Sequence, residues 1–174
     1  VATNYDISYT KGVLLVTEAE AEVPKVLSPI ENETTMITSN LSGQNLTNNV
    51  INGVYYNLGS DGYDSSDQSI VFGQMTNMSA ISDKTPGSSD VKNNFHGIIM
   101  AVNGKGIIKV STQSYGSAKL AVMVGNATSK TESHTTQSDM IVEYDVDNST
   151  NVYIYAVGSS NSTRANPMNG VKTT

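Results

Sequence analysis

The chain has 174 residues, no cysteine, no tryptophan and a net charge of -6 at pH 7. Without cysteine it cannot form disulfides, thiolate zinc sites or iron–sulfur clusters, and its two histidines are too few for a three-histidine catalytic metal site. The acidic balance argues against nucleic acid and anionic membranes as partners. Asparagine, serine and threonine supply 58 residues, one third of the chain, so it hydrogen-bonds mainly through neutral amides and hydroxyls.

This composition, rich in hydroxyl and amide side chains and poor in charge, is typical of secreted bacterial β-sandwiches. No apolar run is long enough to span a membrane, so we expect no membrane insertion. The chain begins at Val1, and we interpret it as a fragment of a larger multimodular protein, extracellular or on the cell surface, whose signal peptide lies outside the fragment. No repeat or linker divides it, which predicts a single domain over residues 1–174.

In chain order, runs of β-branched and aromatic residues with turn residues between them predict a series of short strands. Residues 17–26 have glutamates at a period of two and a proline at Pro24, which fits an edge strand or a short turn of helix. With so little helical signal, the fold class is all-β, an antiparallel sandwich or barrel of about nine or more strands. The expected strands cover residues 12–16, 34–38, 50–58, 69–75, 97–102, 106–111, 119–124, 140–146 and 152–157.

Turn chemistry and alternation predict how these strands pair and face. Asn103-Gly104 predicts a hairpin between residues 97–102 and 106–111, and residues 147–150 are expected to join the last two strands in the same way. Alternation places Leu120 and Val122 on one face of residues 119–124, and Val142, Tyr144 and Val146 on one face of residues 140–146. In the last strand the aliphatic residues are expected to point inward, which leaves Tyr153 and Tyr155 exposed. Long polar loops are expected at residues 60–68, 76–94, 126–139 and 158–174.

The sequence contains no recognisable catalytic motif for a nucleophile, a metalloprotease or a phosphate loop. The acidic loop at residues 60–68 offers one candidate cation site, because clustered carboxylates in a flexible loop can supply the oxygens that a structural calcium ion needs. The same residue types also serve ordinary turns through Asx hydrogen bonds. The candidate ligands are Asp61, Asp64 and Asp67.

Binding of a neutral polysaccharide requires fewer specialised groups than catalysis does. It needs aromatic rings that cover sugar faces, with amides and hydroxyls around them. Tyr63 and Tyr115 lie in glycine-rich polar loops and are candidate platforms, whereas Phe95 precedes a strand and fits a core position better. Two placements remain open. A site in the edge loops, which we favour, would use Tyr63, Asn94, His96, Tyr115 and Arg164; a site on a sheet face would use Tyr153 and Tyr155 with Lys109, Lys119 and Glu143.

The sequence from Phe95 onward contains a Gly-rich strand at residues 104–111, a strand ending in a Gly-Asn turn at residues 119–126, and the strand NVYIYAV followed by a Gly-Ser loop at residues 151–160. This pattern resembles the jelly-roll carbohydrate-binding modules of secreted Bacteroidetes xylanases and pectate lyases. It covers about the last 80 residues, and it departs from many such modules in having no tryptophan.

The resemblance implies a non-catalytic, monomeric module that targets the glycoside hydrolase of the same polypeptide to plant cell-wall polysaccharide. The net charge of -6 would repel uronate-rich pectin, so xylan or xylo-oligosaccharides are the expected ligands. No cofactor is required by this function. The alternative from another class is a structural or adhesive sandwich of a surface protein, and this gains if the tyrosines are scattered or packed inward; a small glycan-acting enzyme is a weaker third option.

Overall fold

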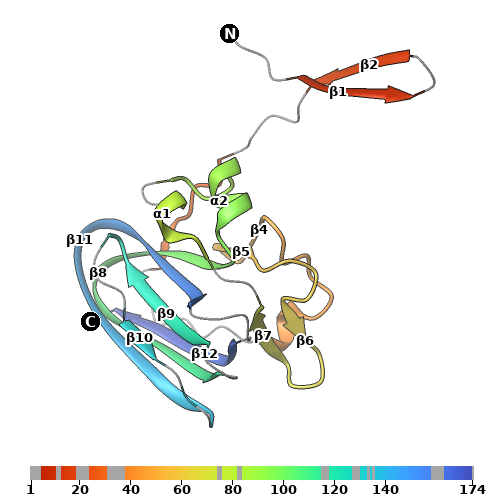
Figure 1. The fold of residues 1–174 in the computed structure, drawn as a ribbon. Helices are drawn as coiled ribbons and strands as arrows, with labels where there is room; N and C mark the ends of the chain where they lie inside the picture. Colours follow the sequence, from red (N-terminus) through yellow and green to blue (C-terminus); the bar gives the residue numbers. More distant parts are fainter. Residues whose placement is uncertain are drawn as a thin grey trace.

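The computed structural model describes residues 5–10, 13–18, 24–30, 38–73, 76–81, 84–114, 118–126, 130–132, 134, 136–157 and 163–173. Within these ranges, the side chains of residues 5–10, 13–18, 38–39, 80 and 163–173 are not described. The described part is mostly antiparallel β-sheet with a few short helices, which confirms the all-β class (Figure 1). The jelly-roll arrangement of the sheet stays a prediction.

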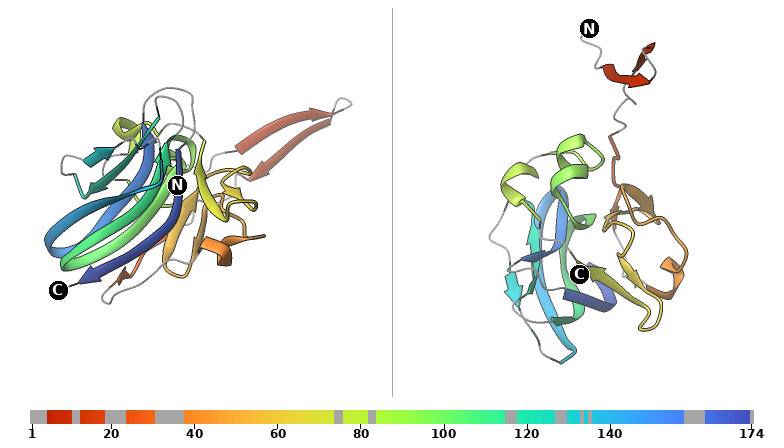
Figure 2. Two further views of the ribbon diagram at one scale, coloured as in Figure 1. Left: turned by 90° about the horizontal axis from the view of Figure 1, so that it is seen from below. Right: turned by 45° about the vertical axis from the view of Figure 1, so that its right-hand side comes forward.

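The first two strands form a hairpin of their own, β1 (Tyr5–Thr10) with β2 (Val13–Glu18), which stands apart from the other strands in all three views (Figures 1 and 2). The strand expected at residues 12–16 is therefore present and slightly longer. Of the edge strand or helix expected at residues 17–26, Thr17 and Glu18 belong to β2, and residues 24–26 have no regular structure. Most of the strand expected at residues 34–38 lies outside the described residues.

The remaining strands form one sheet in the order β10-β9-β11-β8-β12-β7-β6, to which β3, β5 and, through β5, β4 are added. Three short helical segments accompany it: η1 (Thr38–Leu41), α1 (Met78–Ile81) and α2 (Ser89–Asn94). Both α-helices fall in the long loop expected at residues 76–94. The strands are β3 (Pro29–Ile30), β4 (Asn49–Ile51), β5 (Val54–Asn57), β6 (Tyr63–Asp64), β7 (Ser69–Phe72), β8 (Gly97–Ser114), β9 (Lys119–Val124), β10 (Lys130–Glu132), β11 (Ser138–Val157) and β12 (Thr163–Thr173).

Two long strands, β8 and β11, run antiparallel along almost their full length and organise the sheet (Figure 2). The hairpin expected at Asn103-Gly104 is wrong, because the chain continues through it as a single strand. The turn expected at residues 147–150 is wrong for the same reason. These polar residues form a bulge instead: Gly104 pairs with Val146 and Val102 with Thr150, so three residues of β11 lie opposite Asn103.

This bulge divides the pair into two halves with different neighbours. The half that contains residues 97–102 of β8 and 150–157 of β11 is flanked by β9 and β5, which we call the covered half. The half that contains residues 104–114 and 138–146 is flanked by β12, which we call the open half. Because a bulge bends and twists its strand, the two halves curve around a common core (Figure 1).

That main core lies on one face of both halves. It receives Ile98 and Ile154 from the covered half, Val110 and Tyr144 from the open half, and Phe72 from β7. Alternation was therefore read correctly on β9 and β11, since Leu120, Val122, Val142, Tyr144 and Val146 all lie in or against this cluster.

The opposite face of the covered half is also buried, which the sequence analysis did not anticipate. Tyr153 and Tyr155 are only 6% and 4% exposed, so their expected exposure is wrong. The helix α2, capped by the Ser88 side chain, brings Val91 and Phe95 onto this face. The second core consists of Leu27, Tyr55, Ile81, Val91, Phe95, Ile99, Ala101, Ala121, Tyr153 and Tyr155.

The strand β12 lies in the last of the loops expected from sequence, at residues 158–174, and corrects that expectation. It pairs with β8 along the open half and with β7 at its beginning, with register shifts between Ala165 and Met168 and between Asn169 and Val171. Two other expected loops, at residues 60–68 and 126–139, contain the short strands β6 and β10.

Candidate functional site

The described aromatic residues that were expected to bind sugar, Tyr63, Tyr153 and Tyr155, do not share a surface. Tyr63 in β6 is partly buried and packs against the main core. Tyr153 and Tyr155 lie in the second core, on the opposite face of the sheet, where Phe95 meets their rings edge to face at centroid distances of 5.9 and 6.4 Å. The interpretation of Phe95 as a core residue is confirmed, because its side chain is fully buried.

Asn94 and His96 hold the end of α2 in place. The Asn94 side chain donates to the Asp90 carbonyl at 3.0 Å, and its own carbonyl accepts from the Asn77 amide at 2.9 Å. The backbone of His96 donates to and accepts from the Thr76 hydroxyl, at 2.9 and 3.0 Å. Partial burial lowers the pKa of the His96 imidazole, because removal from water disfavours its charged form.

Two further residues of the expected site cannot be placed in full. Tyr115 lies outside the described residues. Arg164 is described by its backbone, which pairs in β12 with Gln113 on one side and Val71 on the other. The structure thus brings none of the expected edge-loop residues together into one described surface.

The acidic loop is held by its own hydrogen bonds. The Asp64 carboxylate accepts from the Ser66 amide at 2.9 Å and from the Ser66 hydroxyl, the pattern of an Asx turn. Asp61 accepts from the Ser60 hydroxyl at 3.3 Å. Over the residues that the structure describes, which include Asp61, Asp64 and Asp67, no three acidic or histidine side chains come close enough to hold a metal ion. The hydrogen bonds agree with the turn interpretation of this loop.

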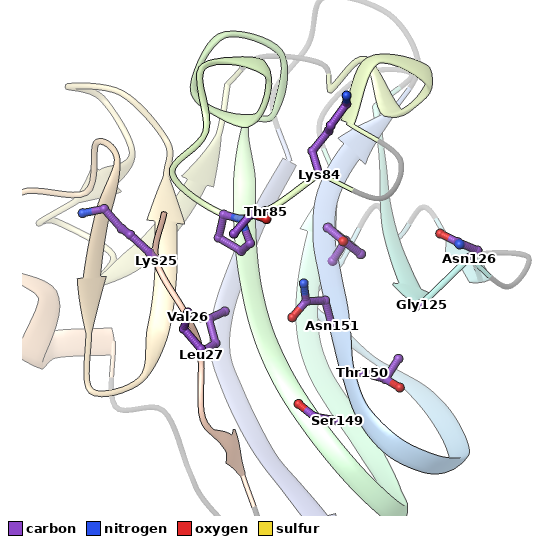
Figure 3. Close-up of a pocket in the computed structure, with 12 residues that line it drawn as sticks. Lys25, Val26, Leu27, Lys84, Thr85, Gly125, Asn126, Ser149, Thr150 and Asn151 are labelled. Atoms are coloured by element: carbon purple, nitrogen blue, oxygen red, sulfur yellow. The ribbon is translucent and has the colours of Figure 1, made fainter. Parts of the chain in front are cut away.

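A groove of about 430 Å³ lies instead beside the bulge in β11, where neutral polar side chains gather (Figure 3). Three segments form it: the residues just before β3, the connection between α1 and α2, and the turn after β9 together with the middle of β11 at the bulge. The lining residues are Lys25, Val26, Leu27, Lys84, Thr85, Pro86, Gly125, Asn126, Ser149, Thr150, Asn151 and Tyr153.

One backbone hydrogen bond joins the first two of these segments, and another closes the third. The Lys25 amide donates to the Pro86 carbonyl at 2.8 Å, which joins the segment before β3 to the connection between the helices. The Gly125 amide donates to the Asn151 carbonyl at 2.8 Å, and Gly125 has φ +57, which favours glycine at this turn. Leu27 anchors the first segment in the second core, so the groove walls are held by packed structure.

The chemistry at the centre of the groove is neutral. Thr85, Ser149 and Thr150 contribute hydroxyls, and Asn126 and Asn151 contribute amides. In Figure 3 the ammonium groups of the two lysines point away from this centre. Because amides and hydroxyls both donate and accept hydrogen bonds, such a lining suits a polyhydroxylated ligand.

Val26 adds an apolar element to the same groove. Its side chain is 90% exposed, which makes it one of two large hydrophobic residues exposed in the described part of the chain. Among the described residues, the side chains of Ser149 and Asn151 make no hydrogen bond, so both are available to a ligand. The groove therefore combines an apolar contact with unoccupied neutral hydrogen-bonding groups.

A second hollow, of about 440 Å³, lies on the outer face of the open half and is a weaker candidate. Two of its three charged groups are already paired, since Lys105 and Asp145 are 2.7 Å apart, and Glu143 adds a further carboxylate. The Asp145 partner raises the pKa of the exposed Lys105 ammonium. A ligand here would have to compete with this ion pair, whereas the neutral side chains of Ser149 and Asn151 in the groove beside the bulge can bind a ligand without breaking an ion pair.

Most residues of the groove were missed by sequence analysis, although two signals pointed toward them. The Gly-Asn turn at Gly125 and Asn126 was noted as part of the resemblance, and residues 147–150 were noted as a polar interruption between strands. Both were interpreted as turns that connect consecutive strands. The bulge shows that such an interruption can also place side chains beside a neighbouring strand end.

A comparison with models of known protein families finds no match, and a comparison with curated proteins finds none either. Within the described part of the chain, none of the helices has the length and apolar character needed to cross a bilayer.

Proposed function

We propose that this protein is a non-catalytic module that binds plant cell-wall polysaccharide, with xylan or xylo-oligosaccharides as the first choice of ligand. In this proposal it is an extracellular or cell-surface module with a jelly-roll-like sandwich fold, and it targets an attached glycoside hydrolase to its substrate. The neutral groove beside the bulge in β11 is the binding site.

The observation that carries the proposal is the lining of that groove. Unoccupied side chains at Ser149 and Asn151 can exchange hydrogen bonds with sugar hydroxyls, and the exposed Val26 can pack against the apolar face of a sugar ring. The described lining residues include neither a carboxylate nor an imidazole, the groups on which glycoside hydrolysis most often depends. Binding without catalysis fits this set of groups best.

The choice of xylan rests on charge. The chain carries -6 at pH 7, so a polygalacturonate chain with a carboxylate on every unit approaches a field of its own sign. A neutral main chain meets no such repulsion and matches the neutral centre of the groove. On this argument we expect xylan to bind and polygalacturonate not to bind, whereas β-glucan, which is also neutral, tests whether the groove distinguishes between neutral main chains.

Affinity electrophoresis in native gels that contain each of these three glycans tests the proposal. We expect xylan to retard the wild-type protein and Asn151→Ala to lose at least half of that retardation. Asn93→Ala is the matched control, because Asn93 is an exposed asparagine of α2 outside the groove. Absence of retardation by xylan overturns the choice of ligand, and absence of retardation by all three overturns the class of function.

One observation favours a second function, a structural or adhesive module without sugar binding. Tyr153 and Tyr155 are packed inward, and Tyr63 packs on the other side of the sheet, so these tyrosines offer no shared stacking platform. If the tyrosines serve only the cores, the fold has no need of a ligand. The same gels separate the two functions, since a structural module is retarded by none of the glycans.

A further inference from the structure

The charges around the groove differ from those of the protein as a whole. The chain is acidic, with 16 Asp and Glu residues against 10 Lys and Arg residues. Among the described residues that line the groove, the charged ones are two lysines, Lys25 and Lys84. A site with positive charge on an acidic protein marks where a negatively charged group would be accepted.

The positive charges of the two lysines are not offset to the same degree by neighbouring carboxylates. The Lys84 ammonium lies 3.4 Å from the Asp90 carboxylate, and both side chains are about half exposed, so this pair is weak. Lys25 makes no ion pair with any residue that the structure describes. The described residues that line the groove therefore keep a net positive charge after this pairing.

The position of the ammonium groups restricts where a negative charge can be placed. Figure 3 shows both of them directed toward different sides of the groove, away from the neutral centre that Thr85 and Asn151 line. A lysine side chain is long and flexible, so its ammonium can follow a group that leaves the groove. A ligand carboxylate would reach these ammonium groups only if it belonged to a side branch that leaves the groove.

We infer that, on the basis of the proposed function, the groove selects a glycan whose neutral main chain carries occasional carboxylate-bearing side groups. The main chain occupies the neutral centre, and the lysine on the side where the branch leaves the groove, Lys25 or Lys84, binds its carboxylate at the rim. A fully charged polyuronate remains excluded, since its carboxylates would lie along the neutral centre and would face the acidic protein as a whole.

Isothermal titration calorimetry tests this with two xylo-oligosaccharides of equal length, one unsubstituted and one that carries a single glucuronic acid branch. We expect the wild-type protein to bind the branched ligand roughly two- to fivefold more tightly at low salt, the effect of an exposed charge contact. The preference should disappear at high salt, because salt screens exposed charges. It should also disappear in the double variant Lys25→Gln with Lys84→Gln.

The control is Lys119→Gln, which removes an exposed lysine of β9 outside the groove and should keep the preference. Equal binding of the two ligands, or weaker binding of the branched one, overturns this inference and leaves the proposed function standing. A preference that survives in the double lysine variant also overturns it, because the charge would then be recognised elsewhere. If neither ligand binds, the proposed function fails and this inference with it.

Discussion

The covered and the open halves of the β8–β11 pair have similar alternating patterns but different surroundings. In the covered half both faces are buried, with Ile154 in the main core and Tyr155 in the second. In the open half only one face is buried, and the other presents Ile141, which is 46% exposed, beside the Lys109–Asp139 ion pair. Alternation determines which residues share a face of the sheet, whereas the burial of that face depends on which other segments of the chain pack against it.

The chain segment that contains Phe95 packs against the second face of the covered half and buries it. Replacement of Phe95 by alanine is expected to have the largest effect, a loss of about 3–5 kcal/mol in the free energy of unfolding, because it removes a fully buried ring. Urea unfolding followed by circular dichroism measures it. A loss below about 1 kcal/mol would contradict the assignment of this face as a packed core.

Hydrogen bonds of one buried asparagine also hold this covering segment in place. The Asn57 side chain donates to the carbonyls of Lys92 and Phe95, at 2.9 and 2.6 Å, and accepts from the Asn48 amide at 3.1 Å. Asn57→Ala leaves these groups without their partner, so we expect a loss of about 1–3 kcal/mol. Asn93→Ala serves as the matched control in the same urea series, and an equal effect of the two replacements would argue against this role of Asn57.

The open half should tolerate change on its outer face. Ile141→Thr keeps a β-branched side chain at an exposed strand position, and we expect the free energy of unfolding to change by less than about 0.5 kcal/mol. The same urea titration measures it. A loss comparable to that of Phe95→Ala would mean that this face is covered, and the contrast between the two halves would fail.

The sequence was sufficient for the fold class and for most strand positions, because β-branched runs and period-two alternation are local signals. It was insufficient for connections, as the Asn-Gly dipeptides illustrate. Asn52-Gly53 forms a tight hairpin between β4 and β5, and both residues have positive φ, at 50° and 78°. At Asn103-Gly104 only the glycine has positive φ, and the strand continues. What differs is the long-range partner β11, which no local pattern reveals.

The dependence on long-range partners also explains why the candidate site was not predicted from the sequence. The alternation of Tyr153 and Tyr155 against Ile154 was read correctly, but their burial depends on Phe95 and Val91, which lie about 60 residues earlier in the chain. The groove likewise gathers residues near positions 25, 85, 126 and 150, and backbone hydrogen bonds join Lys25 to Pro86 and Gly125 to Asn151. Composition predicted its neutral amide and hydroxyl chemistry, whereas its location required the fold.

The central claim, that the neutral groove binds xylo-oligosaccharides, is tested most directly by an NMR titration of backbone amides with unsubstituted xylo-oligosaccharide. We predict that the largest shift changes cluster at Thr85, Gly125, Asn126 and residues 149–151. Shift changes centred on Tyr63, Asn94 or His96 would move the site to the edge loops, and the absence of any change at millimolar ligand would contradict sugar binding itself.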